Sequence, residues 1–276
     1  MKYTQWLNIW LENYMKPSAK PKTYLRYSEI VNKQLALNFE KYDMNELTPI
    51  IFQKFITDLL TSGNKRTGEG LSANTVNTII TVIQSSMRTA YNLGYTENEI
   101  SGKIKRPRLS EKQITCFTLT EQKKIETEIM KSRKSKMKGI LICLYTGLRI
   151  GELLALEWSD IDLINKEIRV TKTCFDGKNQ NGIFSRITNA PKTNTSIRTV
   201  PIPGKLIPVL REMKCGNKYL ISDGDKILSV RSYQRSFERL LSKIGVEKKG
   251  FHSIRHTFAT RALEVGMDIK TLSDVI

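Results

Sequence analysis

The sequence predicts a mainly α-helical protein with a small antiparallel β-sheet, divided into two domains. Three observations support this prediction. Apolar residues recur at helical spacing through most of the first hundred residues. Three short segments between residues 167 and 202 have strand character and are separated by Asn, Gly and Pro. Between these regions, residues 106–117 combine proline and basic side chains with little apolar periodicity, which is typical of a linker.

Length and composition agree with two soluble domains. The chain has 276 residues, of which 39% are hydrophobic, and a domain usually spans about 100–200 residues. No apolar run reaches the roughly 18 residues of a membrane span, and the N-terminus lacks the apolar stretch of a signal peptide. We therefore expect a cytoplasmic protein that does not enter a membrane. The four cysteines are too widely spaced for a zinc site or a small disulfide scaffold.

Residues 1–105 are expected to form a bundle of four main helices. These begin near the N-terminus, near Lys22, at Pro49 and after the capping residue Ser72, and the last one ends at Gly94. The aromatic and aliphatic stripes along them are more typical of a core than of a binding site.

Residues 118–276 are expected to mix helices with strands. Thr118 and Glu121 have the spacing of a capping box, which opens the first helix of this part. Further helices are expected at 140–145, 230–244, 251–265 and 269–276. Strands are expected at 167–173, 182–188 and 196–202, and the second and third are predicted to form a hairpin.

The chain carries a formal charge of +18, and both of its halves are basic. Residues 1–110 hold 15 Lys+Arg against 9 Asp+Glu, and residues 111–276 hold 30 against 18. Such a charge predicts a polyanionic partner, most often nucleic acid, although a merely soluble basic protein has the same composition. A long polyanion that touches both halves fits the even distribution.

Six basic residues are candidates for contact with nucleic acid. Two of them, Lys65 and Arg66, lie in a predicted loop. The other four form a cluster around the start of the linker: Lys103, Lys105, Arg106 and Arg108. This cluster either follows a phosphate backbone between the two domains or is a solvated connector, and the sequence favours neither reading over the other.

Three motifs carry candidate catalytic residues. TGLRIGEL at 146–153 ends one helix with a glycine turn and places Arg149 before the next, with Glu152 close enough to orient it. PKTNTSIRTVPI at 191–202 places Lys192 in a turn between two predicted strands. HSIRH at 252–256 places His252 and Arg255 on one helical face, where both can meet one phosphate. Each pattern alone is more often structural than functional.

In this order and spacing, TGLRIGEL, PKTNTSIRTVPI and HSIRHTFATRALEVG resemble the tyrosine recombinase (phage integrase) family over roughly residues 118–276. The N-terminal bundle resembles the helical core-binding domain that precedes the α+β catalytic domain in this family. The resemblance implies a core-binding domain at 1–105, a basic linker at 106–117 and a catalytic domain at 118–276. It also implies that the two domains form a C-shaped clamp around duplex DNA.

The resemblance implies a role for each candidate residue. Arg149 and Arg255 match two catalytic arginines, whose planar guanidinium groups stabilise the charge that phosphoryl transfer places on non-bridging oxygens. Lys192 matches a lysine that protonates the leaving sugar oxygen, and His252 a histidine that accepts a proton from the attacking phenol. Glu152 matches an acidic residue that supports Arg149. Because two arginines do work that other enzymes give to metal ions, no metal or other cofactor is expected.

The implied function is that of a site-specific DNA recombinase or integrase of a mobile element. Such an enzyme cleaves and rejoins DNA strands through a 3′-phosphotyrosyl intermediate and needs no ATP. The implied partners are double-stranded DNA, further copies of the chain in a tetramer, and accessory DNA-bending or directionality factors. A type IB topoisomerase shares this chemistry, but a core-binding domain ahead of TGLRIGEL favours a recombinase.

The chain departs from the family pattern at its C-terminal end. The pattern continues after LSDVI with a Leu-Gly-His segment and then the nucleophilic tyrosine, yet none of the ten tyrosines of this chain follows Arg255. Tyr219 and Tyr233 precede it and are expected in a strand and in a helix core, and His256 is expected to be structural. We therefore expect a truncated catalytic domain without a nucleophile, which binds DNA but does not cleave it. The alternative is a non-catalytic DNA-binding protein that uses the same scaffold to grip phosphates.

Overall fold

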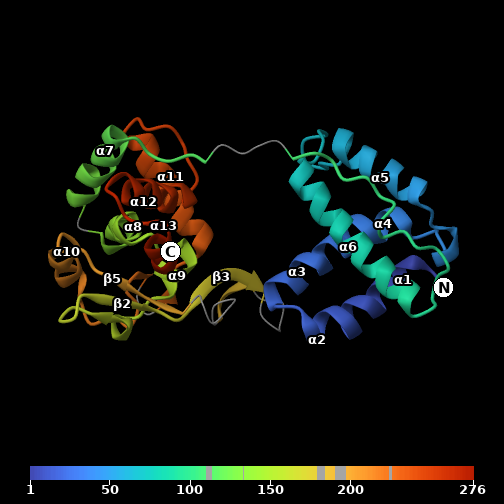
Figure 1. Cartoon of the computed structure of the whole chain (residues 1–276), viewed down its shortest axis with the longest axis horizontal. Helices are drawn as coiled ribbons and strands as arrows, with labels where there is room; N and C mark the ends of the chain where they lie inside the picture. Colours follow the sequence, from blue (N-terminus) through green and yellow to red (C-terminus); the bar gives the residue numbers. More distant parts are fainter. Residues whose placement is uncertain (110–113, 133, 179–183, 190–196, 224–225) are drawn as a thin grey trace. The chain divides into compact units, whose positions relative to one another are not determined.

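The computed structural model describes residues 1–109, 114–132, 134–178, 184–189, 197–223 and 226–276. The chain forms two compact units, Met1–Lys112 and Gln113–Ile276, each with its own hydrophobic core (Figure 1). The boundary between them falls within residues 106–117, where the sequence predicts a linker.

The first unit consists of four long helical stretches. The first runs from α1 (Tyr3–Trp10) through the π-helical segment η1 (Leu11–Met15) to α2 (Lys16–Ser18). The second runs from α3 (Pro21–Ile30) through the π-helical segment η2 (Val31–Leu35) to α4 (Ala36–Phe39). After a 3-10 turn, η3 (Met44–Glu46), follow α5 (Pro49–Ser62) and α6 (Ala73–Asn92). The four helices predicted in this part of the chain are confirmed.

Aromatic side chains from different helices form the core of the first unit. Tyr3, Trp6, Phe39 and Phe52 are all buried. The Trp6 indole N–H donates to the Ser86 carbonyl at 3.1 Å, and the Tyr3 hydroxyl lies 3.1 Å from the Ser86 hydroxyl. These bonds satisfy the polar atoms of two buried rings and fix α1 against α6, so the predicted stripes are core rather than binding surface.

The second unit surrounds a buried helix. Its helical elements are α7 (Leu119–Met130), α8 (Ser135–Thr146), α9 (Ile150–Ala155), the 3-10 turn η4 (Trp158–Asp160), α10 (Leu206–Met213), α11 (Val230–Lys243), α12 (His252–Glu264) and α13 (Ile269–Val275). The predicted capping box opens α7, because the Thr118 hydroxyl accepts from the Glu121 N–H at 3.2 Å. Residues 139–144 of α8 are all buried, and α12 packs along this helix (Figure 1).

Short antiparallel strands complete the second unit. β1 (Ile161–Asp162), β2 (Glu167–Val170) and β5 (Arg198–Pro201) form one sheet in the order β1-β2-β5. β3 (Thr173–Lys178) pairs with β4 (Phe184–Asn189), and β6 (Ser222–Asp223) pairs with β7 (Lys226–Ile227). Ile168 of β2 lies opposite Val200 of β5, and both are fully buried, which fixes the register of the first sheet.

The predicted hairpin of residues 182–188 and 196–202 is wrong. Within the described residues, β4 pairs with β3 and β5 pairs with β2. The sequence prediction ended its first strand at Thr173 and missed β3, because the Asp and Gly at the centre of β3 favour turns. Tertiary structure overrides this preference, since Asp176 accepts hydrogen bonds from the Ser229 hydroxyl and from two backbone N–H groups that begin α11.

The fold class is the predicted one, mainly helical with small antiparallel sheets. No helix within the described ranges is long and apolar enough to cross a membrane. All four cysteines lie in described parts of the chain and are free thiols.

Candidate active site

The turn between α8 and α9 positions the first candidate arginine. Gly147 caps the C-terminal end of α8 with a φ of +68°, a conformation that glycine adopts without strain. A Cβ at this position would lie only 2.5 Å from a ring carbon of Phe258, so the space also requires glycine. The tight turn places Arg149 at the N-cap of α9, two residues after Gly147.

Glu152 in the first turn of α9 holds Arg149 at two points. Its carboxylate accepts from the Arg149 backbone N–H at 2.9 Å and from the Arg149 guanidinium, also at 2.9 Å. The Arg149 side chain is 48% exposed, whereas that of Glu152 is only 7% exposed. The buried carboxylate of Glu152 therefore anchors Arg149, and about half of the Arg149 side chain remains exposed.

α12 brings the second candidate arginine to the same turn. Arg255 is buried, and its guanidinium donates to the Gly147 carbonyl at 2.7 Å. Residues more than a hundred positions apart in the chain thus meet at one turn. His252 lies one helical turn before Arg255 on α12, and its side chain is solvent-accessible. The structure brings Arg149, Glu152, His252 and Arg255 together.

The local electrostatics keep this cluster charged and electropositive. Burial opposes ionisation of Glu152, but hydrogen bonds from Arg198 and from the Arg149 backbone outweigh it and hold the pKa of Glu152 below its ordinary value. Burial, together with the positive charge of Arg149, lowers the pKa of Arg255 to about 10, so this group stays charged at neutral pH. Burial and the neighbouring positive charges lower the pKa of His252, which favours its neutral form.

Arg198 also belongs to this cluster, and no sequence pattern indicated it. This arginine begins β5, and its side chain is only 7% exposed. Its guanidinium donates to both carboxylate oxygens of Glu152, at 3.2 and 2.9 Å, and its Nε–H donates to the Val275 carbonyl at 2.7 Å. The residue stands inside the motif PKTNTSIRTVPI, but its partner lies 46 positions earlier, so no local pattern could pair the two.

The last residues of the predicted linker, 115–117, belong to the second unit and fix the position of α12. The Phe117 N–H donates to the Thr257 hydroxyl at 2.8 Å, and the Phe117 carbonyl accepts from the Arg261 guanidinium at 2.9 Å. The Thr115 and Ser253 hydroxyls lie 3.0 Å apart. These bonds, all within the second unit, hold the helix that carries His252 and Arg255.

The remaining candidate residues are placed as follows. Lys192 lies outside the described residues. His256 packs its ring edge-on against His252, with ring centroids 4.5 Å apart. Tyr233 is buried in α11, as expected, and its hydroxyl donates to the Lys136 carbonyl at 2.6 Å. Tyr219 makes an isolated β-bridge with Glu157.

The predicted nucleic-acid contacts are all solvent-exposed, namely Lys65, Arg66, Lys103, Lys105, Arg106 and Arg108. Arg106 is nevertheless bound to α6, because its guanidinium donates to the Asn77 carbonyl, the Thr81 hydroxyl and the Gln84 side chain at 3.2, 3.2 and 2.6 Å. The start of the linker is thus fixed to the first unit rather than free.

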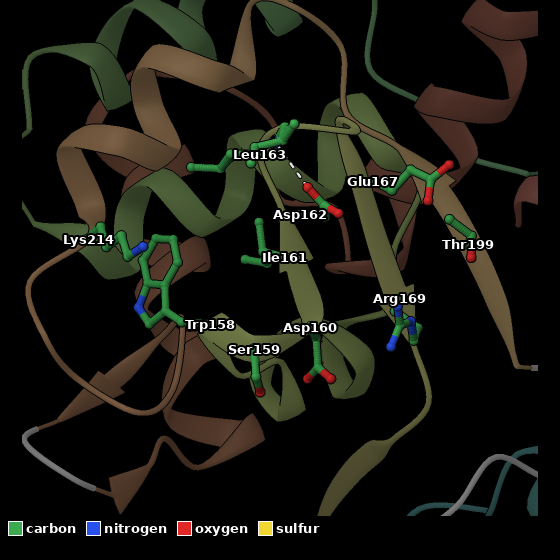
Figure 2. Close-up of a pocket in the computed structure, with 11 residues that line it drawn as sticks. Trp158, Ser159, Asp160, Ile161, Asp162, Leu163, Glu167, Arg169, Thr199 and Lys214 are labelled. Atoms are coloured by element: carbon green, nitrogen blue, oxygen red, sulfur yellow. Dashed lines mark hydrogen bonds between the residues drawn. The ribbon is translucent and has the colours of Figure 1, made fainter.

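A cavity of about 400 Å³ lies elsewhere in the second unit, beside β1 and β2 (Figure 2). Trp158, Ile161 and Leu163 form its apolar lining, and charged side chains such as Asp162 and Arg169 lie around it (Figure 2). Of the predicted catalytic residues that the structure describes, none lines this cavity.

Comparison with known proteins matches both units to domains of one family. A model of the phage integrase family matches residues 108–276, and a model of the phage integrase N-terminal SAM-like domain matches residues 2–60. A tyrosine recombinase XerC-like protein from Caldanaerobacter subterraneus subsp. tengcongensis is 32% identical over an alignment that covers 98% of this chain and 74% of that protein.

Solved structures share the fold. The Tn1549 transposon integrase in complex with a circular intermediate DNA matches with a TM-score of 0.79 and 19% identity, over 100% of this chain and 90% of that one. A lambda integrase tetramer bound to a Holliday junction matches with a TM-score of 0.74 and 19% identity, over 100% of this chain and 77% of that one. At this level of identity the likeness extends to the fold alone.

Proposed function

Because the chain belongs to the phage integrase family of tyrosine recombinases, we propose that it acts on duplex DNA as a site-specific recombinase. The proposed reaction is cleavage and rejoining of DNA strands through a 3′-phosphotyrosyl intermediate. The observation that carries the proposal is the meeting of two arginines at one turn. Arg255 donates to the carbonyl of Gly147, and Arg149 follows two residues later with half of its side chain exposed.

In the proposed reaction the two arginines bind the non-bridging oxygens of one phosphate. Planar guanidinium groups match a phosphate in shape and stay charged, so they stabilise the charge that develops during phosphoryl transfer. Glu152 orients Arg149 from beneath and leaves the outer part of its guanidinium free. His252, with its lowered pKa, is neutral at physiological pH and can accept a proton. Lys192 is proposed to protonate the leaving oxygen of the sugar.

Basic surfaces on both units are proposed to hold the DNA backbone. In the first unit these are Lys65, Arg66 and the exposed residues around the linker start. In the second unit, Arg231, Arg235 and Arg239 recur at intervals of four along the exposed side of α11, so they lie on one helical face. Contacts with phosphates on both units fit a protein with a net charge of +18.

The dependence of DNA affinity on salt tests this part of the proposal. Each neutralised phosphate releases counterions, and a protein that contacts six to ten phosphates loses about 10³–10⁵-fold in affinity between 50 and 200 mM salt. We expect such a loss for the whole chain by fluorescence anisotropy, and weaker binding for Met1–Lys112 or Gln113–Ile276 alone. Equal affinity of one unit and the whole chain, or a flat salt dependence, would contradict DNA binding through both units.

We further propose that a polypeptide of these 276 residues binds DNA but does not cleave it, because no tyrosine follows Arg255. The test is a nicked suicide duplex that carries the target site. It is incubated with this chain and with a version extended through the downstream reading frame. The extended protein should form a covalent protein–DNA adduct that survives denaturant and is lost in Arg149→Ala and Arg255→Ala. An adduct with the 276-residue chain would refute the proposal, and none with either version would favour a non-catalytic DNA-binding protein.

The assembly and the biological setting are proposals too. The Tn1549 protein is a transposon integrase, and the lambda integrase forms a tetramer on a Holliday junction. By analogy, we propose that this chain acts on a mobile element as a tetramer on DNA, with accessory DNA-bending or directionality factors. Native mass spectrometry of the chain with a four-way DNA junction tests the tetramer, since a complex of one or two copies at saturating protein would contradict it.

A further inference from the structure

We propose that Arg198 is a positioning residue that keeps Arg149 available for phosphate by neutralising Glu152. This inference rests on the proposed function, because it assigns a role in the same phosphate site. It follows from an asymmetry between two arginines that share one carboxylate. The Arg198 side chain is 7% exposed and the Arg149 side chain is 48% exposed.

The hydrogen bonds show how the carboxylate is divided. Oε1 of Glu152 accepts from Nη1 of Arg149 and Nη1 of Arg198, at 2.9 and 3.2 Å. Oε2 accepts from the Arg149 backbone N–H and from Nη2 of Arg198, both at 2.9 Å. Arg198 therefore binds the carboxylate with both prongs of its fork, and Arg149 uses only one guanidinium nitrogen.

This division matters because a buried carboxylate requires a charged partner. If Arg198 lost its charge, Arg149 would be the cation of this cluster that remains hydrogen-bonded to Glu152. We expect the Arg149 guanidinium to turn inward and pair with both oxygens. The same donors would then no longer face the solvent side, where a phosphate has to bind.

Contacts inside the second unit hold Arg198 in position. It begins β5, whose register with β2 is set by buried residues, and its Nε–H donates to the carbonyl of Val275 near the end of α13. Three nitrogen atoms of its guanidinium thus donate hydrogen bonds inside the protein, one to Val275 and two to Glu152. Arg198 does not need to touch the substrate, and its contribution passes through Glu152 to Arg149.

The test uses the full 276-residue chain labelled with ¹⁵N-arginine and inorganic phosphate as the probe. In the wild type, phosphate should shift the Nε–H signals of both Arg149 and Arg255. In Arg198→Met the dissociation constant read at Arg149 should rise about tenfold, the scale expected when an outer supporting residue is lost. Arg169→Met, a change of the same kind on the exposed face of β2, should have no effect.

A double variant separates positioning from a merely structural role. If Arg198 acts by neutralising Glu152, then Arg198→Met combined with Glu152→Gln removes the charge that captures Arg149. Phosphate affinity should therefore recover relative to Arg198→Met alone. A structural role predicts the opposite, because two defects in one buried cluster would weaken binding further. Arg198→Lys, which keeps the charge but loses the fork, should lie between wild type and Arg198→Met, and it replaces Arg198→Met if that variant does not fold.

Two outcomes would overturn the inference. One is wild-type phosphate affinity in a folded Arg198→Met variant, and the other is weaker binding in the double variant than in Arg198→Met. Absence of any phosphate response in the wild type would instead refute the proposed phosphate site. In that case the Arg149 Nε–H signal of the phosphate-free protein decides the inference. It should become more ordered in Arg198→Met, and an unchanged signal would contradict the inward turn.

Discussion

Two regions of the second unit combine acidic and basic side chains beside the same three-stranded sheet, but they do so in different ways. Around Glu152, one buried carboxylate is shared by two arginines through four hydrogen bonds, and one arginine is left half exposed. At the cavity beside β1, the Asp162 carboxylate accepts hydrogen bonds from backbone N–H groups of the turn that follows it, and Arg169 is exposed.

A cavity is thus a weaker indication of a functional site than a buried charged group that several side chains bind. The cavity has room and an apolar lining, but the Asp162 carboxylate bonds only to the turn that follows it among the described hydrogen bonds. The Glu152 cluster, in contrast, draws on α9, β5 and α12 and directs charge toward solvent. We therefore expect substitutions in the cluster to have larger effects than matched substitutions in the cavity.

The largest expected effect is on stability. Glu152→Gln removes the charge between Arg149 and Arg198 and should destabilise the second unit by about 3 kcal/mol, because it leaves a buried arginine without its counter-charge. The matched change Asp162→Asn at the cavity should destabilise the unit far less, since this group is near the surface. Hydrogen exchange of residues 139–146, followed by mass spectrometry, reports on the core of this unit. Equal costs for the two variants would remove the distinction between the regions.

The next effect is on DNA binding. Arg149→Ala should lower the affinity for duplex DNA about tenfold, the scale of one charge-assisted hydrogen-bonded contact. The slope of log K against log salt should become shallower by about 0.9, as expected for the loss of one phosphate contact. Arg169→Ala removes the same charge beside the cavity and serves as the control. Fluorescence anisotropy over a salt series measures the affinity and its salt dependence. A larger loss of affinity in Arg169→Ala than in Arg149→Ala would contradict the assignment of Arg149 to the phosphate contact.

A smaller effect should appear in the pH dependence of stability. The folded-state pKa of Glu152 is lowered, so the stability that its ionisation contributes is fully present above its unfolded pKa of about 4.5. That contribution is lost as the pH falls through the lower, folded-state pKa. Wild type should thus lose more stability than Glu152→Gln on acidification below pH 4.5. Thermal melts across this pH range measure the difference. An equal loss of stability in the two proteins would contradict the assignment of a charged Glu152 in the folded state.

The smallest effect is the titration of His252. Burial and the neighbouring cations lower its pKa below the ordinary value of 6.5, so the ring is neutral at pH 7. Arg149→Ala removes one of these cations and should raise the midpoint slightly. The ring proton signals of His252 in an NMR titration measure both. A midpoint above 6.5 in the wild type would contradict the described surroundings of this residue.

Local sequence patterns predicted the elements that depend on local physics. Helical periodicity located α5, α6 and α11, and the capping residues Ser72 and Thr118 lie where the helices begin. The strand pairing could not be predicted in this way. Asp176 lies in a strand because it caps α11, a helix more than fifty positions later in the chain. Turn composition alone gave the wrong hairpin.

The same distinction between local patterns and long-range contacts applies to the candidate site. Arg149 and Glu152 are three residues apart, as are His252 and Arg255, so spacing on a helix could pair them. Arg198 could not be found from spacing, because its hydrogen bonds reach Glu152 across the fold. The contact of Arg255 with the carbonyl of Gly147 is equally remote in sequence. Only the resemblance to a family could place these motifs in one site before the structure did.

The most direct test of the Glu152 cluster as the phosphate site is a crystal structure of this chain with duplex DNA. We predict that the guanidinium groups of Arg149 and Arg255 both lie within about 3 Å of oxygens of one backbone phosphate. We also predict that the cavity beside Trp158 makes no contact with the DNA. Arginines that contact different phosphates, or DNA seated against the cavity, would contradict this account.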